Sequence, residues 1–134
     1  ARQGSTRAPQ WTGGGVVFAP VPRDYSFKMN KKEKRAALKS VLTAKVQENK
    51  VVILDELKFD EIKTKAMVNV LNNVKAEKAI VVLKENDEKV VLSARNIAGV
   101  QTSLVNTINV YDILKHNTLV MTKEAVQAIE EVYA

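Results

Sequence analysis

Apolar and polar residues alternate in blocks through residues 51–134. Short runs rich in β-branched residues predict strands, and the segments between them carry apolar residues three or four positions apart, which predicts helices. The predicted strands are 51–54, 79–83, 100–105 and 119–121, and the predicted helices are 61–74, 107–115 and 122–133. Continuous apolar strands are typically covered on both faces, and helical crossovers join parallel neighbours. The pattern therefore predicts an α/β fold with a mainly parallel sheet of about four strands and helices on both faces.

Two segments of this pattern carry more detail. In the helix predicted at 61–74, a spacing of four lines up Ile62, Ala66, Val70 and Val74, with Met67 and Leu71 beside them. Residues 86–97 fit a strand through Val90 and Val91, or a helix capped by Asn86 or Asp87. We predict the helix, because a strand here would follow the one at 79–83 without a crossover.

A further helix is predicted at residues 31–48, where strong helix formers follow Asn30, a plausible N-cap residue. Its apolar side chains Ala37, Leu38, Val41 and Ala44 fall on one side. Lys32, Arg35 and Lys39 gather largely away from that side. The helix is therefore expected to pack on the domain with one side and to present a basic stripe on the other.

Residues 1–27 have a different character, and we predict that they form an extended arm in front of a globular domain at 28–134. They contain all three prolines and four of the five glycines, and their apolar residues are too few for a core. Such a segment needs a partner to order it.

Charge divides along the same line. The chain has a net charge of +6, yet residues 1–50 carry +8 and residues 51–134 carry −2. A basic segment on a near-neutral body suggests an arm that binds a polyanion. The plainer interpretation is a solvated surface that keeps the protein soluble.

The strongest suggestion of catalysis is Asp55-Glu56 after the apolar run 51–54, which resembles a strand that holds Mg²⁺ in nucleotide hydrolases. The phosphate-binding motif G-x-x-x-x-G-K-[ST] is absent, as is the dinucleotide motif G-x-G-x-x-G. We therefore interpret Asp55 and Glu56 as the polar exit of a buried strand. A nucleotide-hydrolysing α/β enzyme is the weaker alternative.

Other catalytic and metal chemistry finds little support in the sequence. There are no cysteines, and His116 is the only histidine, so zinc and thiol chemistry are not expected. No G-x-S-x-G motif is present to supply a nucleophilic serine. His116 is expected at the C-terminal end of a helix, facing its dipole. We predict no enzymatic activity, no metal and no cofactor.

The arm offers the clearest binding chemistry. Arginine binds phosphate bidentately and stacks on bases, tryptophan stacks as well, and glycine allows close backbone approach. The predicted RNA-binding residues are Arg2, Arg7, Trp11, Gly13, Gly14, Gly15, Arg23, Lys28, Lys31, Lys32, Lys34, Arg35 and Lys39. Two alternatives remain: a disordered tail, and a module that binds acidic proteins through Lys32, Arg35 and Lys39.

Several motifs together resemble one family. The run A-R-Q-G-S-T-R-A-P-Q-W at residues 1–11 and G-G-G-V-V-F at 13–18 closely resemble the returning arm of the extended loop in bacterial-type large-subunit ribosomal protein four. The likeness continues through Pro22-Arg23, 31–35, 37–40, 54–56, 63–65, 92–96, 108–110, 114–116 and 121–123. It covers essentially the whole chain.

This resemblance implies a function. Members of that family bind large-subunit ribosomal RNA, help subunit assembly, and reach with a long loop toward the nascent-peptide exit tunnel. The implied partners are that RNA and neighbouring ribosomal proteins, without membrane or small-molecule substrate, and the implied location is the cytoplasmic ribosome. Family members also have an upstream strand, helix and outgoing loop arm. The chain therefore resembles an N-terminally truncated member, whose sheet would have an unpaired edge.

Overall fold

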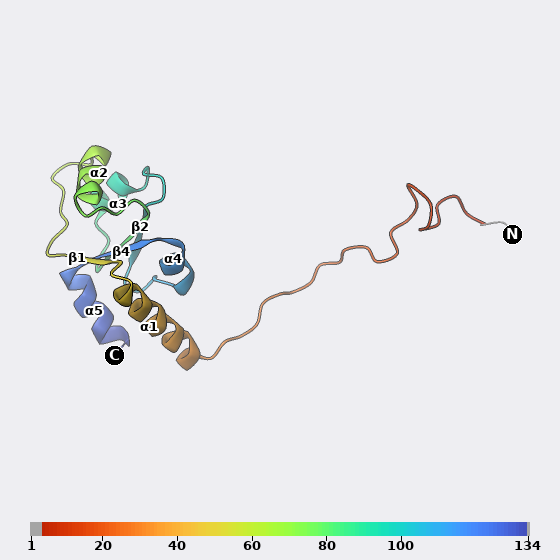
Figure 1. The fold of residues 1–134 in the computed structure, drawn as a ribbon, viewed down its shortest axis with the longest axis horizontal. Coiled ribbons are helices and arrows are strands. Elements are labelled where there is room, and N and C mark those ends of the chain that lie inside the picture. The colour runs from red at the N-terminus through yellow and green to blue at the C-terminus, as the bar shows by residue number, and fades with distance from the viewer. Residues whose placement is uncertain (1–3, 134) are drawn as a thin grey trace.

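The computed structural model describes residues 4–133 as an α/β domain from which a long N-terminal segment extends (Figure 1). The elements are α1 (Lys31–Gln47), β1 (Val51–Leu54), α2 (Thr64–Asn73), β2 (Ala79–Leu83), α3 (Glu88–Ala94), β3 (Gln101–Leu104), α4 (Val110–Lys115), β4 (Thr118–Thr122) and α5 (Lys123–Tyr133). Residues 16–30 run from the domain to a turn-rich segment near the N-terminus without helix or strand.

The four strands form one all-parallel sheet in the order β1-β4-β2-β3. The last strand in sequence, β4, lies between β1 and β2, pairing Leu119 with Val51 on one side and with Ile80 on the other. Every residue of the inner strand β2 is buried. On the edge strand β1, Ile53 is 57% exposed. The predicted α/β fold with a four-stranded parallel sheet is confirmed.

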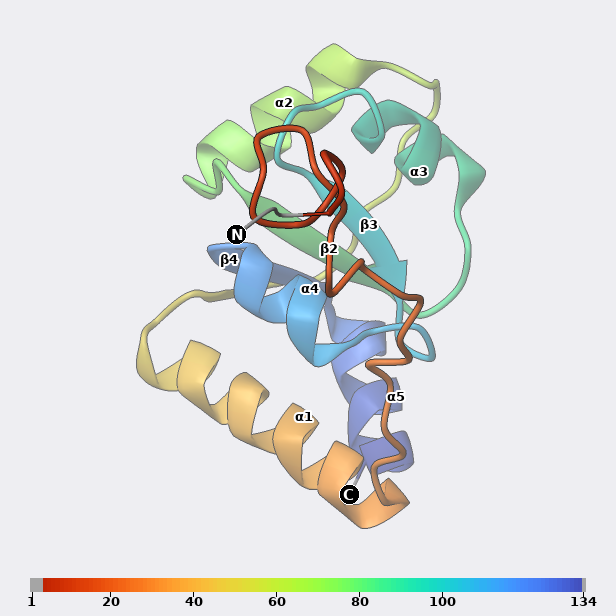
Figure 2. The same cartoon turned by 90° about the vertical axis from the view of Figure 1, so that its right-hand side faces the viewer.

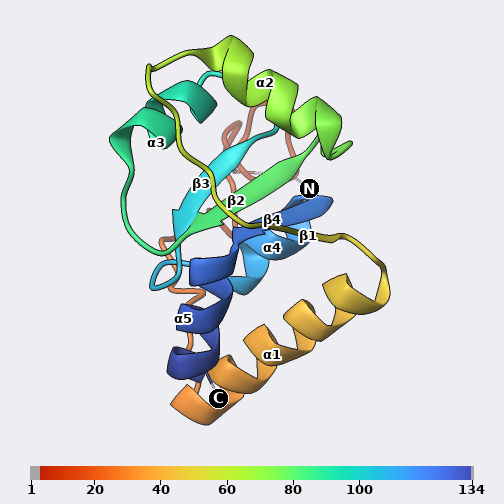
Figure 3. The ribbon, with the colours of Figure 1, turned by 90° about the vertical axis from the view of Figure 1, so that its left-hand side faces the viewer.

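Helices cover both faces of this sheet, as Figures 2 and 3 show from opposite sides. Successive side chains of a strand point to opposite faces, so Ile80 and Val82 enter one core while Val81 and Leu83 enter the other. The first core is closed by α1, α4 and α5, and the second by α2 and α3. The prediction of helices on both faces is thus also confirmed.

The start of α2 differs from the prediction. The helix begins at Thr64, because Lys63 is extended with φ −139° and ψ 116°, and Ile62 lies before it and is 54% exposed. The helix packs through Met67 and Leu71, which are both buried, with Val70 and Val74 partly buried against the same core. The backbone N–H of Lys63 donates to Ser93 Oγ at 3.1 Å, which ties the entry to α2 against α3. The predicted start at residue 61 is therefore wrong.

Two short helices begin at side-chain caps. Residues 88–94 form helix α3, as predicted, and the Asp87 carboxylate accepts a hydrogen bond from Lys89 N at 2.9 Å. Helix α4 begins at Val110, because Asn109 Oδ1 accepts from Asp112 N at 2.8 Å. An N-cap of this kind fixes where a helix starts, so α4 starts three residues later than the pattern predicted.

The first helix, α1, starts after Asn30 as predicted, with the Glu33 carboxylate accepting a hydrogen bond from Asn30 N at 3.1 Å. Leu38 is buried against the sheet and Val41 packs beside it. One residue of this inner face was not predicted from its apolar pattern: Lys45 is only 6% exposed.

The buried amine of Lys45 donates hydrogen bonds to backbone carbonyls at the C-terminal end of α4. Its Nζ donates to the carbonyl oxygens of His116 at 2.7 Å and Asn117 at 3.2 Å. His116 is the C-cap residue of α4, and its Nδ1 lies 2.7 Å from Asp112 O. A cation at a helix C-terminus is favourable because the last carbonyls carry partial negative charge. His116 thus has the predicted position, and Lys45 joins α1 to α4.

Candidate nucleic-acid interface

Residues 7–15 close into a compact loop, which we call the arm loop. Gly15 N donates to Arg7 O at 2.9 Å and closes the two ends. Inside it, Trp11 N donates to Ala8 O at 3.0 Å and Gly14 N donates to Trp11 O at 2.9 Å. The sequence predicted extended chain throughout residues 1–27. That prediction is wrong for the arm loop, because its proline and glycines support successive turns.

The glycines of the arm loop have separate reasons to be glycine. A Cβ on Gly14 would lie 2.0 Å from Ala8 O, far inside van der Waals contact and against backbone. Gly13 has φ +75°, a left-handed conformation that favours glycine. A Cβ on Gly15 would lie 3.6 Å from Arg7 O, an ordinary contact. Gly14 is therefore required by the loop itself, a reason that differs from the predicted close approach to RNA.

The arm loop presents two of the predicted RNA-binding side chains. Arg7 is exposed, and Trp11 is 46% exposed. Because the loop is closed by backbone hydrogen bonds, the guanidinium and the indole come from one small unit of defined shape. Arg2 lies outside the described residues.

The extended part of the arm carries a second group of these side chains. The Arg23 guanidinium carbon lies 4.2 Å from the centroid of the Tyr25 ring. Asp24, between them, accepts hydrogen bonds from Ser26 N at 2.8 Å and Ser26 Oγ at 2.7 Å, and these bonds lower the pKa of its carboxyl. The negative charge of Asp24 is therefore held by Ser26, while Arg23 stacks on an aromatic ring.

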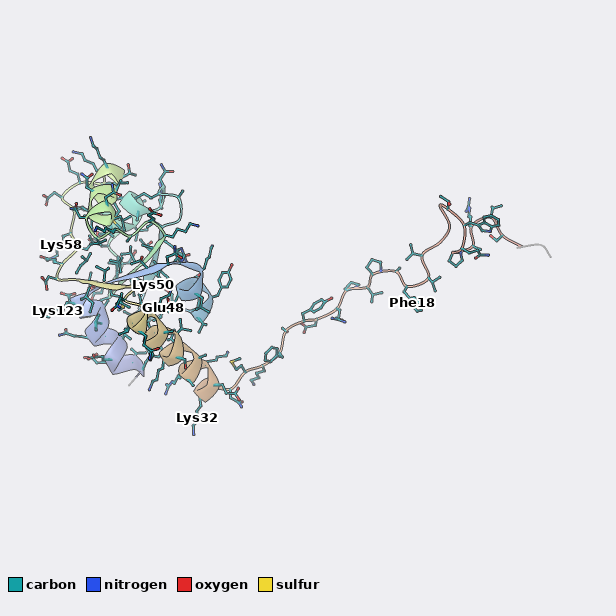
Figure 4. The ribbon with its side chains drawn as sticks, viewed as in Figure 1. Phe18, Lys32, Glu48, Lys50, Lys58 and Lys123 are labelled. Carbon is teal, nitrogen blue, oxygen red and sulfur yellow. The ribbon has the colours of Figure 1, made fainter. Side chains whose placement is uncertain are left out.

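A third group lies on the first turns of α1. The exposed basic side chains there and just before the helix are Lys28, Lys31, Lys32, Lys34, Arg35 and Lys39. Figure 4 shows Lys32 at the end of α1 where the arm joins it. Among the described residues, no ion pair within 4 Å involves any of these six side chains.

The structure thus arranges the predicted RNA-binding residues along a line. The arm loop lies at the far end of the N-terminal segment, well away from α1 (Figure 1). Within residues 4–39, basic groups occur at both ends of the line and at Arg23 between them. A partner that contacts all three groups must itself be large and negatively charged over a long distance.

Comparison with known proteins identifies the relatives of this chain. The model of the ribosomal protein L4/L1 family matches residues 1–132. The chain belongs to this family. The resemblance inferred from the arm and domain motifs is therefore confirmed.

Three relatives in the family illustrate the similarity, each named large ribosomal subunit protein uL4. The protein from Agathobacter rectalis is 69% identical to this chain, that from Clostridium botulinum 55%, and that from Thermoanaerobacter sp. strain X514 54%. Each comparison covers all of this chain and 65% of the relative. The chain therefore spans just under two thirds of the length of these uL4 proteins.

In this L4/L1 family member the carboxyl ends of the strands form a second surface, where the alternative nucleotide site would lie. A cavity of about 350 Å³ there is lined by Asp55, Glu56, Leu57, Lys58, Leu83, Lys84, Glu85, Asn86, Asp87, Glu88, Thr122 and Glu124. Six of these side chains are acidic and two are basic, which repels phosphate. The Glu56 carboxylate pairs with the Lys58 amine and raises the pKa of Lys58. The lining includes no glycine, so nothing in it resembles a phosphate cradle.

Within residues 4–133, no group of three or more His, Cys, Asp or Glu side chains is arranged to hold a metal ion. No helix in the described part of the chain is both long and apolar enough to cross a membrane.

Proposed function

We propose that this chain is a non-catalytic structural constituent of the large ribosomal subunit in the cytoplasm, where it binds large-subunit ribosomal RNA through its arm and the outer side of α1. The observation that carries the proposal is the linear basic surface from Arg7 to Lys39 on a chain whose relatives are large-subunit proteins. The near-neutral α/β domain carries this surface, because α1 packs on its sheet and the arm extends from α1.

The chemistry of the basic surface suits RNA. Lysine and arginine side chains that reach phosphates release condensed counterions, which drives association. Arginine additionally binds phosphate in a bidentate manner, and Trp11 offers a face on which a base can stack. Because the three basic groups are spread along the arm, the RNA must offer phosphates along an extended path.

The length of the arm supports a role within folded RNA. Residues 16–30 contain no helix or strand, and fifteen residues span at most about 50 Å when fully extended. Such a segment carries the arm loop deep into a ribonucleoprotein while the domain stays outside. We therefore include a contribution to subunit assembly, and a reach toward the nascent-peptide exit tunnel, in the proposed function.

The direct test is binding of the purified chain to large-subunit ribosomal RNA fragments, measured by filter retention against an unrelated structured RNA of equal length. We expect at least tenfold preference for a ribosomal fragment, because a long arm fits only RNA of matching shape. An acidic polypeptide should not compete. Equal affinity for both RNAs, or displacement by the polypeptide, would contradict the proposal.

The same assay separates the enzyme alternative. The double substitution Asp55→Ala with Glu56→Ala alters only the acidic carboxyl edge, so RNA affinity should stay within about twofold. A nucleotide hydrolase activity that this pair of substitutions abolishes would instead support the hydrolase.

A further inference from the structure

The arm contains a stretch without charge that RNA binding alone does not explain. Between Arg7 and Arg23 lie fifteen residues, 8–22, and none of them is charged. The part beyond the arm loop is apolar: the exposed fraction is 73% for Val16, 66% for Val17, 92% for Phe18 and 77% for Val21. Figure 4 shows Phe18 on the extended arm, far from the α/β domain.

These apolar side chains do not serve the protein's own core. Neither hydrophobic core includes any of the described residues 4–37. Clustered apolar side chains exposed to this degree usually mark a surface that another molecule covers. Because residues 16–22 form no helix or strand and their side chains enter neither core, the covering molecule must supply the complementary surface.

The chemistry of the stretch favours a protein over RNA as that molecule. Within residues 16–22 only Phe18 has a flat face for stacking on a base, Val16, Val17 and Val21 are aliphatic, and the stretch has no cation for phosphates. Pro20 and Pro22 also lack an N–H that could donate to a phosphate oxygen. An apolar groove on a folded protein, in contrast, gains free energy from covering each of these side chains.

We propose that residues 16–22 dock as an extended peptide in an apolar groove of a neighbouring protein in the same ribonucleoprotein particle. Arg7 and Arg23 contact RNA on either side of that protein. This inference rests on the proposed function, since it places the chain in such a particle. It assigns protein contact to the middle of the arm and RNA contact to its ends.

The first experiment locates the contact by photo-crosslinking in purified large-subunit particles reconstituted with a chain carrying Phe18→p-benzoylphenylalanine. We expect an adduct of one defined ribosomal protein that survives ribonuclease digestion. The matched control is Trp11→p-benzoylphenylalanine, which should give an adduct that ribonuclease removes. A ribonuclease-sensitive adduct from position 18, or no adduct, would overturn the inference.

The second experiment measures affinity with a variant that keeps every charge, Val16→Ser with Val17→Ser and Phe18→Ser. These side chains are exposed, so the domain should fold normally. We expect at least tenfold weaker binding to large-subunit core particles that lack this protein, and unchanged binding to protein-free ribosomal RNA. The control Leu114→Ser removes an exposed apolar side chain from α4, which is 60% exposed, and should change neither.

The outcomes separate the two proposals. If the unmodified chain binds neither RNA nor particles, the proposed function and this inference both fail. If it binds both, and the serine variant binds particles as tightly as the unmodified chain, only the inference fails. Equal losses on particles and on protein-free RNA would assign residues 16–18 to RNA and overturn the inference, as would an equal loss with Leu114→Ser.

Discussion

Single atoms decide the shape of the arm loop. The hydrogen of Gly14 occupies the place where any other residue would put a Cβ, 2.0 Å from Ala8 O. The neighbouring Gly15 has no such neighbour, since its Cβ would lie 3.6 Å from Arg7 O. The two adjacent glycines therefore form a matched pair in which one is structurally required and the other is not.

Replacing these glycines tests whether the closed loop matters for RNA binding. Gly14→Ala should open the loop and weaken binding to ribosomal RNA about tenfold, which corresponds to losing roughly one stacked base. Gly15→Ala should stay within about twofold. Both variants should melt at the same temperature as the unmodified chain, because the loop lies outside the two cores. Equal RNA affinities for the two variants would show that loop closure has no role.

The sequence could not have distinguished these glycines. Three successive glycines indicate freedom of the backbone, yet only the position of Ala8 O relative to each Cα shows which glycine the loop requires. Trp11 is 46% exposed, because an isolated aromatic residue among turn formers has no core to enter, and its contact with RNA stays a prediction. Lys45 was missed because its role depends on a carbonyl 71 residues away in the chain.

At the scale of elements, α1 has two unlike sides. Its basic outer residues, such as Lys39, are exposed, whereas Lys45 is buried and donates to the carbonyls that end α4. The chain thus places chemically identical side chains on one helix for different purposes. One lysine is predicted to contact RNA, and the other stabilises the packing of α1 on α4.

Two substitutions on α1 should therefore affect different properties, one the stability of the fold and the other the affinity for RNA. Lys45→Met removes a buried hydrogen bond to His116 O and a partly buried one to Asn117 O, and it should lower the free energy of unfolding by about 1–3 kcal/mol, as measured in urea. Lys39→Met should leave stability within about 0.5 kcal/mol, as expected for a surface substitution. RNA affinity, measured where both variants are folded, should fall only for Lys39→Met. A stable Lys45→Met protein with weakened RNA binding would contradict this division.

The ends of the strands were predicted more accurately from the sequence pattern than the starts of two helices. The four strands were predicted to within one residue of their ends, because runs of apolar and β-branched residues mark them. Burial on both faces holds for the inner strand β2, whereas the edge strands β1 and β3 are mostly half-buried. The starts of α2 and α4 were predicted too early, since apolar spacing does not register an extended Lys63 or an Asn109 cap. The exposed Ile62 has the same origin, because it fits the spacing but precedes the helix.

At the scale of the whole molecule, positive and negative charge are concentrated at different ends. Residues 1–50 carry a net charge of +8, while the opposite carboxyl edge of the sheet has a cavity lined by six acidic and two basic residues. An RNA that approaches this protein is attracted at one end and repelled at the other, so its orientation is fixed by charge. We therefore propose that the phosphate contacts come from the arm and α1.

The measurement that tests this claim most directly is the salt dependence of ribosomal RNA affinity for two variants, each with six basic residues changed to Gln. One variant changes Arg7, Arg23, Lys28, Lys32, Arg35 and Lys39, and the other changes Lys65, Lys75, Lys78, Lys84, Lys115 and Lys123, all exposed. The first should flatten the slope of log affinity against log salt by about four to five, at nearly one per lost phosphate contact. The second should leave the slope unchanged, and an equal flattening by both variants would contradict the account.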